Sequence, residues 1–201
     1  DPDIDGLVMA VTGTLSGSKK GKIWRSTDNG TTWKPSADTP LAFWTDIVYS
    51  AKTGSGDRYY WASAFTLNSY KLFRSSDRGI TWKSVSVPLS AYAQQGLDIA
   101  ASALEAKTLY VLAGTDQKIL KTTNAGKFWQ DVTNDFPTGD TISTGYNWSQ
   151  YTYDYFIGCS VYTDSHGVKQ DAVYVGLIDV AQSLDGGKHW RSIGGPTHDV
   201  T

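Results

Sequence analysis

The stretch RSTDNGTTW, residues 25–33, recurs three more times along the chain. The later copies are RSSDRGITW (74–82), KTTNAGKFW (121–129) and QSLDGGKHW (182–190). All four follow the pattern Ser/Thr-x-Asp/Asn-x-Gly-x-x-Trp. Ser, Asp and Asn side chains accept hydrogen bonds from backbone N–H groups in tight turns, and Gly adopts backbone conformations that a Cβ penalises. Each copy is therefore predicted to be a hairpin turn between two short strands.

The recurring positions of the motif are assigned a structural role, in which the Trp is expected to bury apolar area between neighbouring sheets. Asn124 replaces Asp in the third copy, and it can still accept the hydrogen bonds of the turn. Four equivalent carboxylates, one per repeat, cannot converge on one substrate bond, so the motif is not predicted to be catalytic. The sixteen positions are Ser26, Asp28, Gly30, Trp33, Ser75, Asp77, Gly79, Trp82, Thr122, Asn124, Gly126, Trp129, Ser183, Asp185, Gly187 and Trp190.

The spacing of the motifs predicts an all-β β-propeller. The closing tryptophans at positions 33, 82, 129 and 190 lie 49, 47 and 61 residues apart, a period typical of propeller blades. Between the second and third motifs lie four short β-rich runs, 96–103, 108–115, 118–123 and 127–133, which is the content of one four-stranded antiparallel blade.

The chain is predicted to be a single propeller segment, 1–201, of about four blades. Blade 1 lacks its innermost strand because nothing before Asp5 is able to supply it. Open blade faces are costly, so we expect part of a larger propeller whose remaining blades lie elsewhere in the protein or on another chain. A four-bladed ring closed on itself is the alternative. The predicted blades are 1–36 (partial), 37–86, 87–133 and 134–195, with 196–201 leading into a next blade.

The repeated pattern is identified as the Asp-box (BNR) repeat. It resembles the repeats of sialidases, xyloglucan-cleaving glycoside hydrolases, sortilin-type receptors and the photosystem II assembly factor family. The resemblance covers the whole chain and implies a β-propeller. Those families differ in activity while sharing the turn, so the resemblance says little about function.

The long third interval places an insertion, residues 134–154, on the face opposite the hairpin turns. Loops of this length often carry function, and the aromatic rings here, mixed with amides and carboxylates, suit sugar rings. The alternative is that these aromatics pack the insertion against its own blades. The candidate ligand-binding residues on this face are Trp44, Tyr92, Tyr146, Trp148, Tyr151 and Tyr153.

Enzymatic readings find weak support in the sequence. Sialidases use an arginine triad and a Tyr activated by Glu, whereas most arginines here adjoin the repeated motifs and the single Glu, Glu105, falls in a predicted turn. A xyloglucanase-like enzyme needs two Asp on the binding face. Asp135, Asp140 and Asp154 are eligible by position, and no motif selects among them.

The opening residues DPDIDG match the start of a calcium loop, in which alternate carboxylates converge on the ion. Asp1, Asp3 and Asp5 are therefore candidate calcium ligands. The bidentate acid that closes such a loop is missing, because the twelfth position is Thr12. A solvated acidic tail is the other interpretation, and no cofactor is required.

Composition excludes several classes of partner. The net charge is -2 without a basic run, which argues against nucleic acid, and no apolar stretch reaches the roughly 18 residues of a membrane span. The single cysteine, Cys159, excludes an internal disulfide framework. The chain opens without Met or a signal peptide, so a processed extracellular or periplasmic piece is expected.

The favoured function is binding or scaffolding, with a carbohydrate or protein ligand held on the loop-rich face. One alternative is a glycoside hydrolase fragment whose active site is completed by missing blades. A second alternative is a structural subunit that assembles through its open blade edges.

Overall fold

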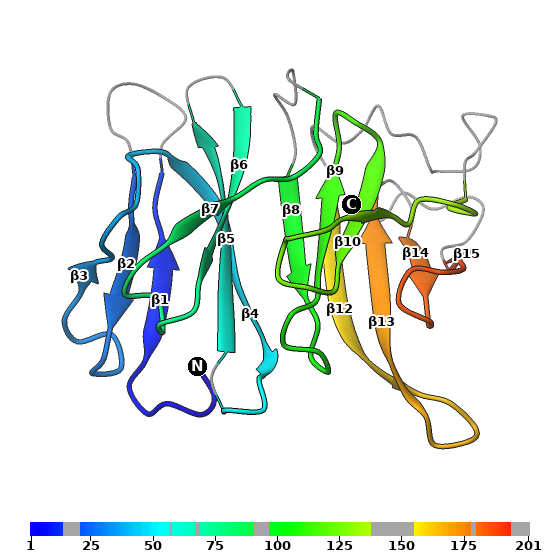
Figure 1. The fold of residues 1–201 in the computed structure, drawn as a ribbon, viewed down its shortest axis with the longest axis horizontal. Coiled ribbons are helices and arrows are strands. Elements are labelled where there is room, and N and C mark those ends of the chain that lie inside the picture. The colour runs from blue at the N-terminus through cyan, green and yellow to red at the C-terminus, as the bar shows by residue number, and fades with distance from the viewer. Residues whose placement is uncertain are drawn as a thin grey trace.

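A computed structural model describes residues 1–13, 21–56, 58–66, 69–90, 97–137, 155–177 and 180–193. Within these ranges the regular secondary structure consists of β-strands. They form one three-stranded and three four-stranded antiparallel sheets, called blades 1 to 4. Within each blade, every strand pairs with the next strand along the chain (Figure 1). The predicted all-β fold is confirmed, and in this part of the chain blade 1 has three strands, as expected.

Each blade begins with its inner strand, except blade 1. Blade 1 contains β1 (Val8–Val11), β2 (Ile23–Ser26) and β3 (Lys34–Pro35). Blade 2 contains β4 (Phe43–Lys52), β5 (Arg58–Thr66), β6 (Ser69–Ser75) and β7 (Lys83–Val85). Blade 3 contains β8 (Leu97–Ala101), β9 (Leu109–Ala113), β10 (Lys118–Thr122) and β11 (Gln130–Asp131). Blade 4 contains β12 (Phe156–Thr163), β13 (Lys169–Gly176), β14 (Val180–Ser183) and β15 (Arg191–Ser192).

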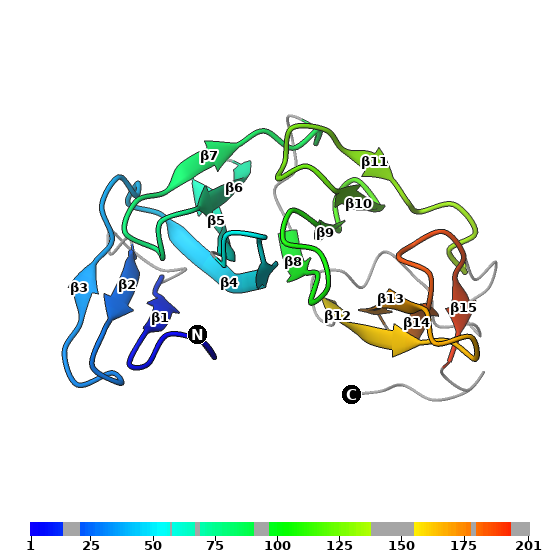
Figure 2. The ribbon, with the colours of Figure 1, turned by 60° about the horizontal axis from the view of Figure 1, so that its bottom comes forward.

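The blades stand side by side along an open arc (Figure 2). The inner strands β4, β8 and β12 line its concave side, and β3, β7 and β11 lie on the convex side. The repeated motifs turn at one end of the blades, toward the bottom of Figure 1, which we call the box side. The connections from one blade to the next run at the other end, which we call the loop side. This arrangement is that of part of a β-propeller.

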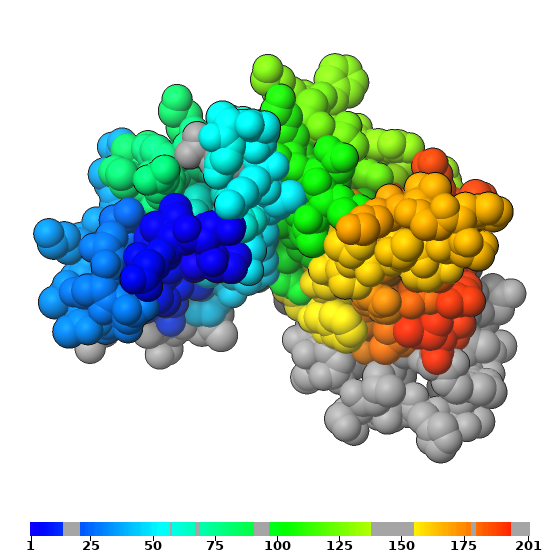
Figure 3. Space-filling view, turned by 90° about the horizontal axis from the view of Figure 1, so that it is seen from below, coloured from blue at the N-terminus to red at the C-terminus, as the bar shows by residue number. Residues whose placement is uncertain are grey.

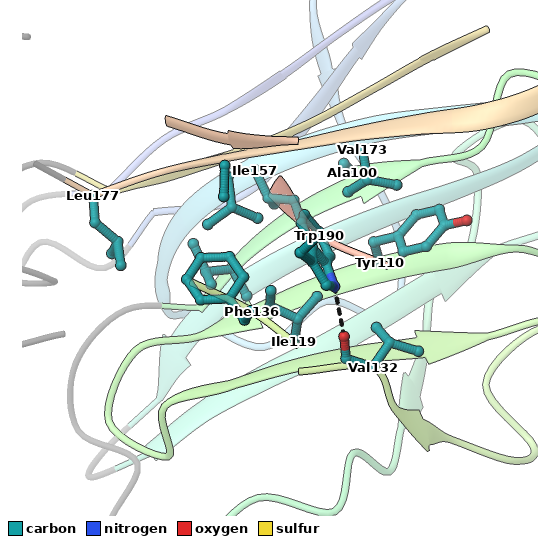
Figure 4. Close-up of a cluster of buried hydrophobic side chains, with 12 residues drawn as sticks. Ala100, Tyr110, Ile119, Val132, Phe136, Ile157, Val173, Leu177 and Trp190 are labelled. Atoms are coloured by element: carbon teal, nitrogen blue, oxygen red, sulfur yellow. Dashed lines mark hydrogen bonds between the residues drawn. The ribbon is translucent and has the colours of Figure 1, made fainter. Parts of the chain in front are cut away.

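The hydrophobic core lies between blades rather than within them. Three clusters fill the three junctions, and Figure 4 shows the one between blades 3 and 4. Every residue of β9 is buried, because this strand is covered on both faces by neighbouring blades. Such a strand reads as a continuous apolar run rather than an alternating one. Stability therefore depends on blade-to-blade packing.

A truncation at a junction should destabilise the protein. Leu72 is fully buried between blades 2 and 3, so Leu72→Ala is expected to lower the free energy of unfolding by about 2–5 kcal/mol. The matched change Leu41→Ala, at an exposed leucine, should stay within about 0.5 kcal/mol of wild type. Urea unfolding measures both, and similar losses in the two variants would contradict this account of the core.

Candidate functional site

The repeated motif forms a hydrogen-bonded corner on the box side. In the first copy Ser26 Oγ donates to Asp28 Oδ1 (2.7 Å) and accepts from the N–H of Gly30 (2.8 Å). The same Asp28 oxygen accepts from the N–H of Thr32 (2.8 Å). The other copies repeat these bonds with Ser75, Asp77, Gly79 and Thr81, with Thr122, Asn124, Gly126 and Phe128, and with Ser183, Asp185, Gly187 and His189.

Each corner contains two successive residues with a left-handed backbone. In the first copy Asn29 has φ +56° and Gly30 has φ +83°. The equivalent pairs are Arg78 and Gly79, Ala125 and Gly126, and Gly186 and Gly187. A left-handed conformation costs free energy for a residue with a Cβ, so the side-chain hydrogen bonds of the corner offset a local strain.

The motif tryptophans are placed differently at the first copy. Trp82 and Trp190 are buried at blade junctions and Trp129 is half-buried. The Nε1 groups of Trp129 and Trp190 donate to carbonyls of the preceding blade (2.8 Å each), and Figure 4 shows the second bond. Among the described residues no blade precedes that of Trp33, and Trp33 is 38% exposed against 3% for Trp82.

The motif Asp is matched by a donor four residues later. Thr32 and Thr81 donate their hydroxyls to the second carboxylate oxygen of Asp28 and Asp77 (2.6 and 2.5 Å). His189 Nδ1 lies 2.6 Å from the corresponding oxygen of Asp185. The side-chain and backbone hydrogen bonds of Thr32 are the main reason that the pKa of Asp28 falls to about 2.

The third copy changes both members of this pair. Phe128 occupies the donor position and is exposed, and its partner is Asn124 rather than Asp. Phe128 offers no side-chain donor, so a carboxylate here would have one oxygen without a side-chain partner. A neutral amide avoids that charge. The Asn in the third motif is thus explained by the residue at the donor position.

A double-mutant cycle tests this pairing. Asn124→Asp alone should be neutral or destabilising, because the new carboxylate lacks a side-chain donor. Combined with Phe128→Thr it restores the Asp–Thr pair, with a favourable coupling of about 0.5 kcal/mol or more in urea unfolding. Additive effects of the two substitutions would contradict the pairing.

The acidic opening segment is bound to cations of blade 2. Asp3 lies 2.9 Å from Lys52 Nζ and also pairs with Arg58, whose Nε lies 3.4 Å from an Asp1 oxygen. Figure 3 shows this blue segment against the cyan hairpin between β4 and β5. Asp5 is exposed. Among the residues described, no three acidic, His or Cys side chains gather to hold a metal ion, and calcium at Asp1, Asp3 and Asp5 stays a prediction.

Trp44 is a core residue, which corrects its assignment to the ligand face. Its side chain is 3% exposed, and its ring packs against Phe73 with centroids 4.9 Å apart between blades 1 and 2. A ligand has no access to it. Asp135 is exposed on the loop side and has a left-handed backbone, φ +59°. The other predicted residues, Tyr92, Asp140, Tyr146, Trp148, Tyr151, Tyr153 and Asp154, lie outside the described residues.

Phe136 shows that the first aromatic of the long insertion packs inward. It is buried between blades 3 and 4, where its ring meets Trp190 edge-on with centroids 5.3 Å apart (Figure 4). Phe136 therefore packs the insertion against its own blades and does not belong to a ligand surface.

A hollow of about 570 Å³ opens on the loop side between blades 2 and 3. It is within the usual size of small-ligand pockets, about 300–1,000 Å³. The start of β6 and the end of β7 form one wall, and residues 86–90 extend it. The N–H of Ser90 donates to Asp116 (2.7 Å), which holds this segment against the turn between β9 and β10. Its polar lining residues are Ser69, Tyr70, Lys71, Ser84, Ser86 and Ser90.

Two aspartates meet on the inner strands, and the sequence reasoning did not find them. Asp46 on β4 and Asp98 on β8 hydrogen-bond to each other through their side chains. Asp46 also accepts the N–H of Ile47 (2.6 Å), and Asp98 accepts the N–H of Ile157 from blade 4 (2.9 Å). The pair therefore links blades 2, 3 and 4. The signal in the sequence is an Asp-Ile pair at the same place in two repeats, TDIV and LDIA.

Burial and the neighbouring Asp98 raise the pKa of Asp46 to about 7. Burial likewise raises the pKa of Asp98. Two carboxyl groups in contact cannot both ionise readily, so the pair retains one proton near neutral pH. Glycosidases separate their two carboxyl groups by roughly 5–9 Å, which hydrogen-bonded carboxyls do not match. The pair is a titrating link between blades.

The stability of the protein should fall across neutral pH. With its pKa raised from 3.8 to about 7, Asp46 binds its proton more tightly in the folded state. Its contribution to stability is complete at low pH and is lost as pH rises through about 7. In wild type the urea-unfolding midpoint should fall between about pH 5 and about pH 8, and in Asp46→Asn it should change less with pH. Asp38→Asn, at an exposed left-handed position, is the control, and an equal decline in D46N would contradict the assignment.

The family model described as Sortilin, neurotensin receptor 3 (Sortilin-Vps10) matches residues 21–136, which is more than half of the chain. The chain belongs to the Sortilin-Vps10 family. The matched residues include the first three motifs, so the resemblance to Asp-box propeller proteins is confirmed. A search of curated proteins gave no match.

Two solved structures share the fold of this Sortilin-Vps10 family member at 17% sequence identity. YCF48 from Cyanidioschyzon merolae gives a TM-score of 0.52 over 96% of this chain and 57% of that protein. The GH74 xyloglucanase from Xanthomonas campestris gives 0.58 over 96% of this chain and 29% of that protein. The chain thus spans only part of either relative. No helix among the described residues is long and apolar enough to cross a membrane.

Proposed function

We propose that this chain is the binding segment of a larger, extracytoplasmic β-propeller, and that it holds a carbohydrate or a protein segment on the loop side. The observation that carries the proposal is the polar hollow between blades 2 and 3. The predicted ligand residue Tyr92 follows two residues after Ser90 in the sequence. The family description, a receptor, and the xyloglucanase neighbour both favour binding of such ligands.

The lining of the hollow supports a polar ligand. The hydroxyls of Ser69, Ser84 and Ser86 both donate and accept hydrogen bonds, as sugar hydroxyls and peptide groups require. Tyr70 adds an aromatic ring for the C–H face of a sugar or an apolar side chain. Its ring is steadied by Phe65, with centroids 5.2 Å apart.

Filling the hollow should weaken binding. Ser84→Arg places a long cationic side chain where the ligand would lie, and it is expected to weaken affinity by about tenfold or more. Xyloglucan oligosaccharides and an immobilised peptide library are the probes, with affinities measured by isothermal titration calorimetry. Ser165→Arg adds the same charge to an exposed site on the box side and should bind as wild type does. Binding that survives Ser84→Arg would place the site elsewhere.

The two alternatives give different outcomes in simple assays. Release of reducing sugar from xyloglucan that is lost in Asp135→Asn would support the glycoside hydrolase alternative and contradict a binding-only segment. A weight-average mass from light scattering that rises with the concentration of the wild-type protein would support the self-assembling alternative.

A further inference from the structure

The same hydrogen bond recurs at each blade junction on the box side. The donor is a cationic residue directly before the motif Ser or Thr of one blade. The acceptor is the carbonyl of the residue directly before the motif Gly in the next blade. The three pairs are Arg25 Nε to Arg78 (2.8 Å), Arg74 Nη1 to Ala125, and Lys121 Nζ to Gly186 (2.9 Å).

The local structure explains why this bond repeats. All three acceptors have a left-handed backbone, with φ of +62°, +60° and +71°, and this conformation presents the carbonyl to the neighbouring blade. Two of the three donors are held by aromatic rings, since Arg74 lies over Tyr59 (5.0 Å) and Lys121 over Tyr110 (5.2 Å). Hydrogen bonds from a charged donor are stronger than neutral ones. We call this bond the cation clasp.

Among the described residues, the clasp is incomplete in blade 1 and in blade 4. In blade 1 the acceptor position is Asn29, with φ +56°, and no donor among the described residues reaches its carbonyl. In blade 4 the donor position is Gln182 rather than a cation. The Oε1 of Gln182 accepts from Arg191 Nε (3.0 Å) and Nη2 (2.6 Å).

The face of blade 1 that points away from blade 2, which we call the outer flank, has the apolar residues of a face that packs against a neighbouring blade. Each apolar residue on it aligns with a residue of blade 2 that packs against blade 1. Trp33 and Val8 are 38% and 39% exposed, whereas their counterparts are buried. The aligned pairs are Val8 and Tyr60, Ala10 and Ala62, Trp24 and Phe73, and Trp33 and Trp82.

We propose that this flank is the docking surface for a further Asp-box blade that carries Arg or Lys directly before its motif Ser or Thr. That cation donates to the carbonyl of Asn29, and Trp33 packs into the new junction as Trp82 does in the next one. Three identical clasps in one register support the continuation of the series. A second copy of this chain is disfavoured as the occupant, because its blade 4 presents Gln182, which Arg191 already engages.

The chain itself supplies a probe for this surface. Gln182→Arg gives blade 4 the missing cation, so that one copy should dock its blade 4 on blade 1 of another. The new arginine would face Arg191 on the neighbouring strand. The fold accommodates two cations at this place in other blades, since Arg25 pairs across strands with Lys34 and Arg74 with Lys83. Sedimentation equilibrium should show a dissociation constant for self-association about tenfold or more below that of wild type.

Three variants make the test decisive. Gln182→Arg combined with Trp33→Lys should return association to the wild-type level, because the docking flank is spoiled. Ser165→Arg adds the charge away from both flanks and should change nothing. Gln182→Lys supplies the same cation if the arginine variant fails to fold.

Several results would overturn the proposal. One is association of Gln182→Arg and Gln182→Lys no tighter than that of wild type or Ser165→Arg. Another is association that persists with Trp33→Lys. Wild type that associates as tightly as Gln182→Arg would show that a second copy, and not a cation-bearing blade, occupies the flank.

Discussion

The hydrogen-bonded corner of the repeated motif is the constraint on which the structure depends. Ser26 and Asp28 hold two successive left-handed residues, and the same turn geometry exposes one carbonyl to the neighbouring blade. At three junctions that carbonyl accepts a cation from the preceding blade. A single local turn therefore closes a hairpin and also joins two blades. This double role explains why the motif recurs once per blade.

Placing the core between blades separates structural from functional surfaces. A strand such as β9 is buried on both faces, so no blade has a core of its own and each depends on its neighbours. The box side is committed to turns and clasps, with its carboxylates already hydrogen-bonded. Where the structure describes it, the loop side carries no such repeated bonds. The polar hollow at Ser84 and Ser86 lies on that side.

Local features of the fold could be predicted from the sequence, and long-range ones could not. The turn at Gly30 follows from residue types within a few positions, and so do the strands on either side. The burial of Trp44 depends on Phe73, in another strand, and strand propensity does not reveal it. The pairing of Asp3 with Lys52 likewise requires the folded chain, and the pattern DPDIDG alone does not reveal it. Asp46 and Asp98 lay unnoticed because each, taken alone, is an ordinary polar residue in a strand.

The junction between blades 2 and 3 is tied at both ends by bonds of different chemistry. On the box side Arg74 donates to Ala125, and an arginine does not lose its charge at any physiological pH. Toward the loop side Asp46 and Asp98 share a proton, and the pKa of Asp46 is about 7. A rise in pH therefore weakens one tie and leaves the other intact. Because the weakened tie is near the start of β4 and β8, the change acts on the loop side of the junction that contains the polar hollow.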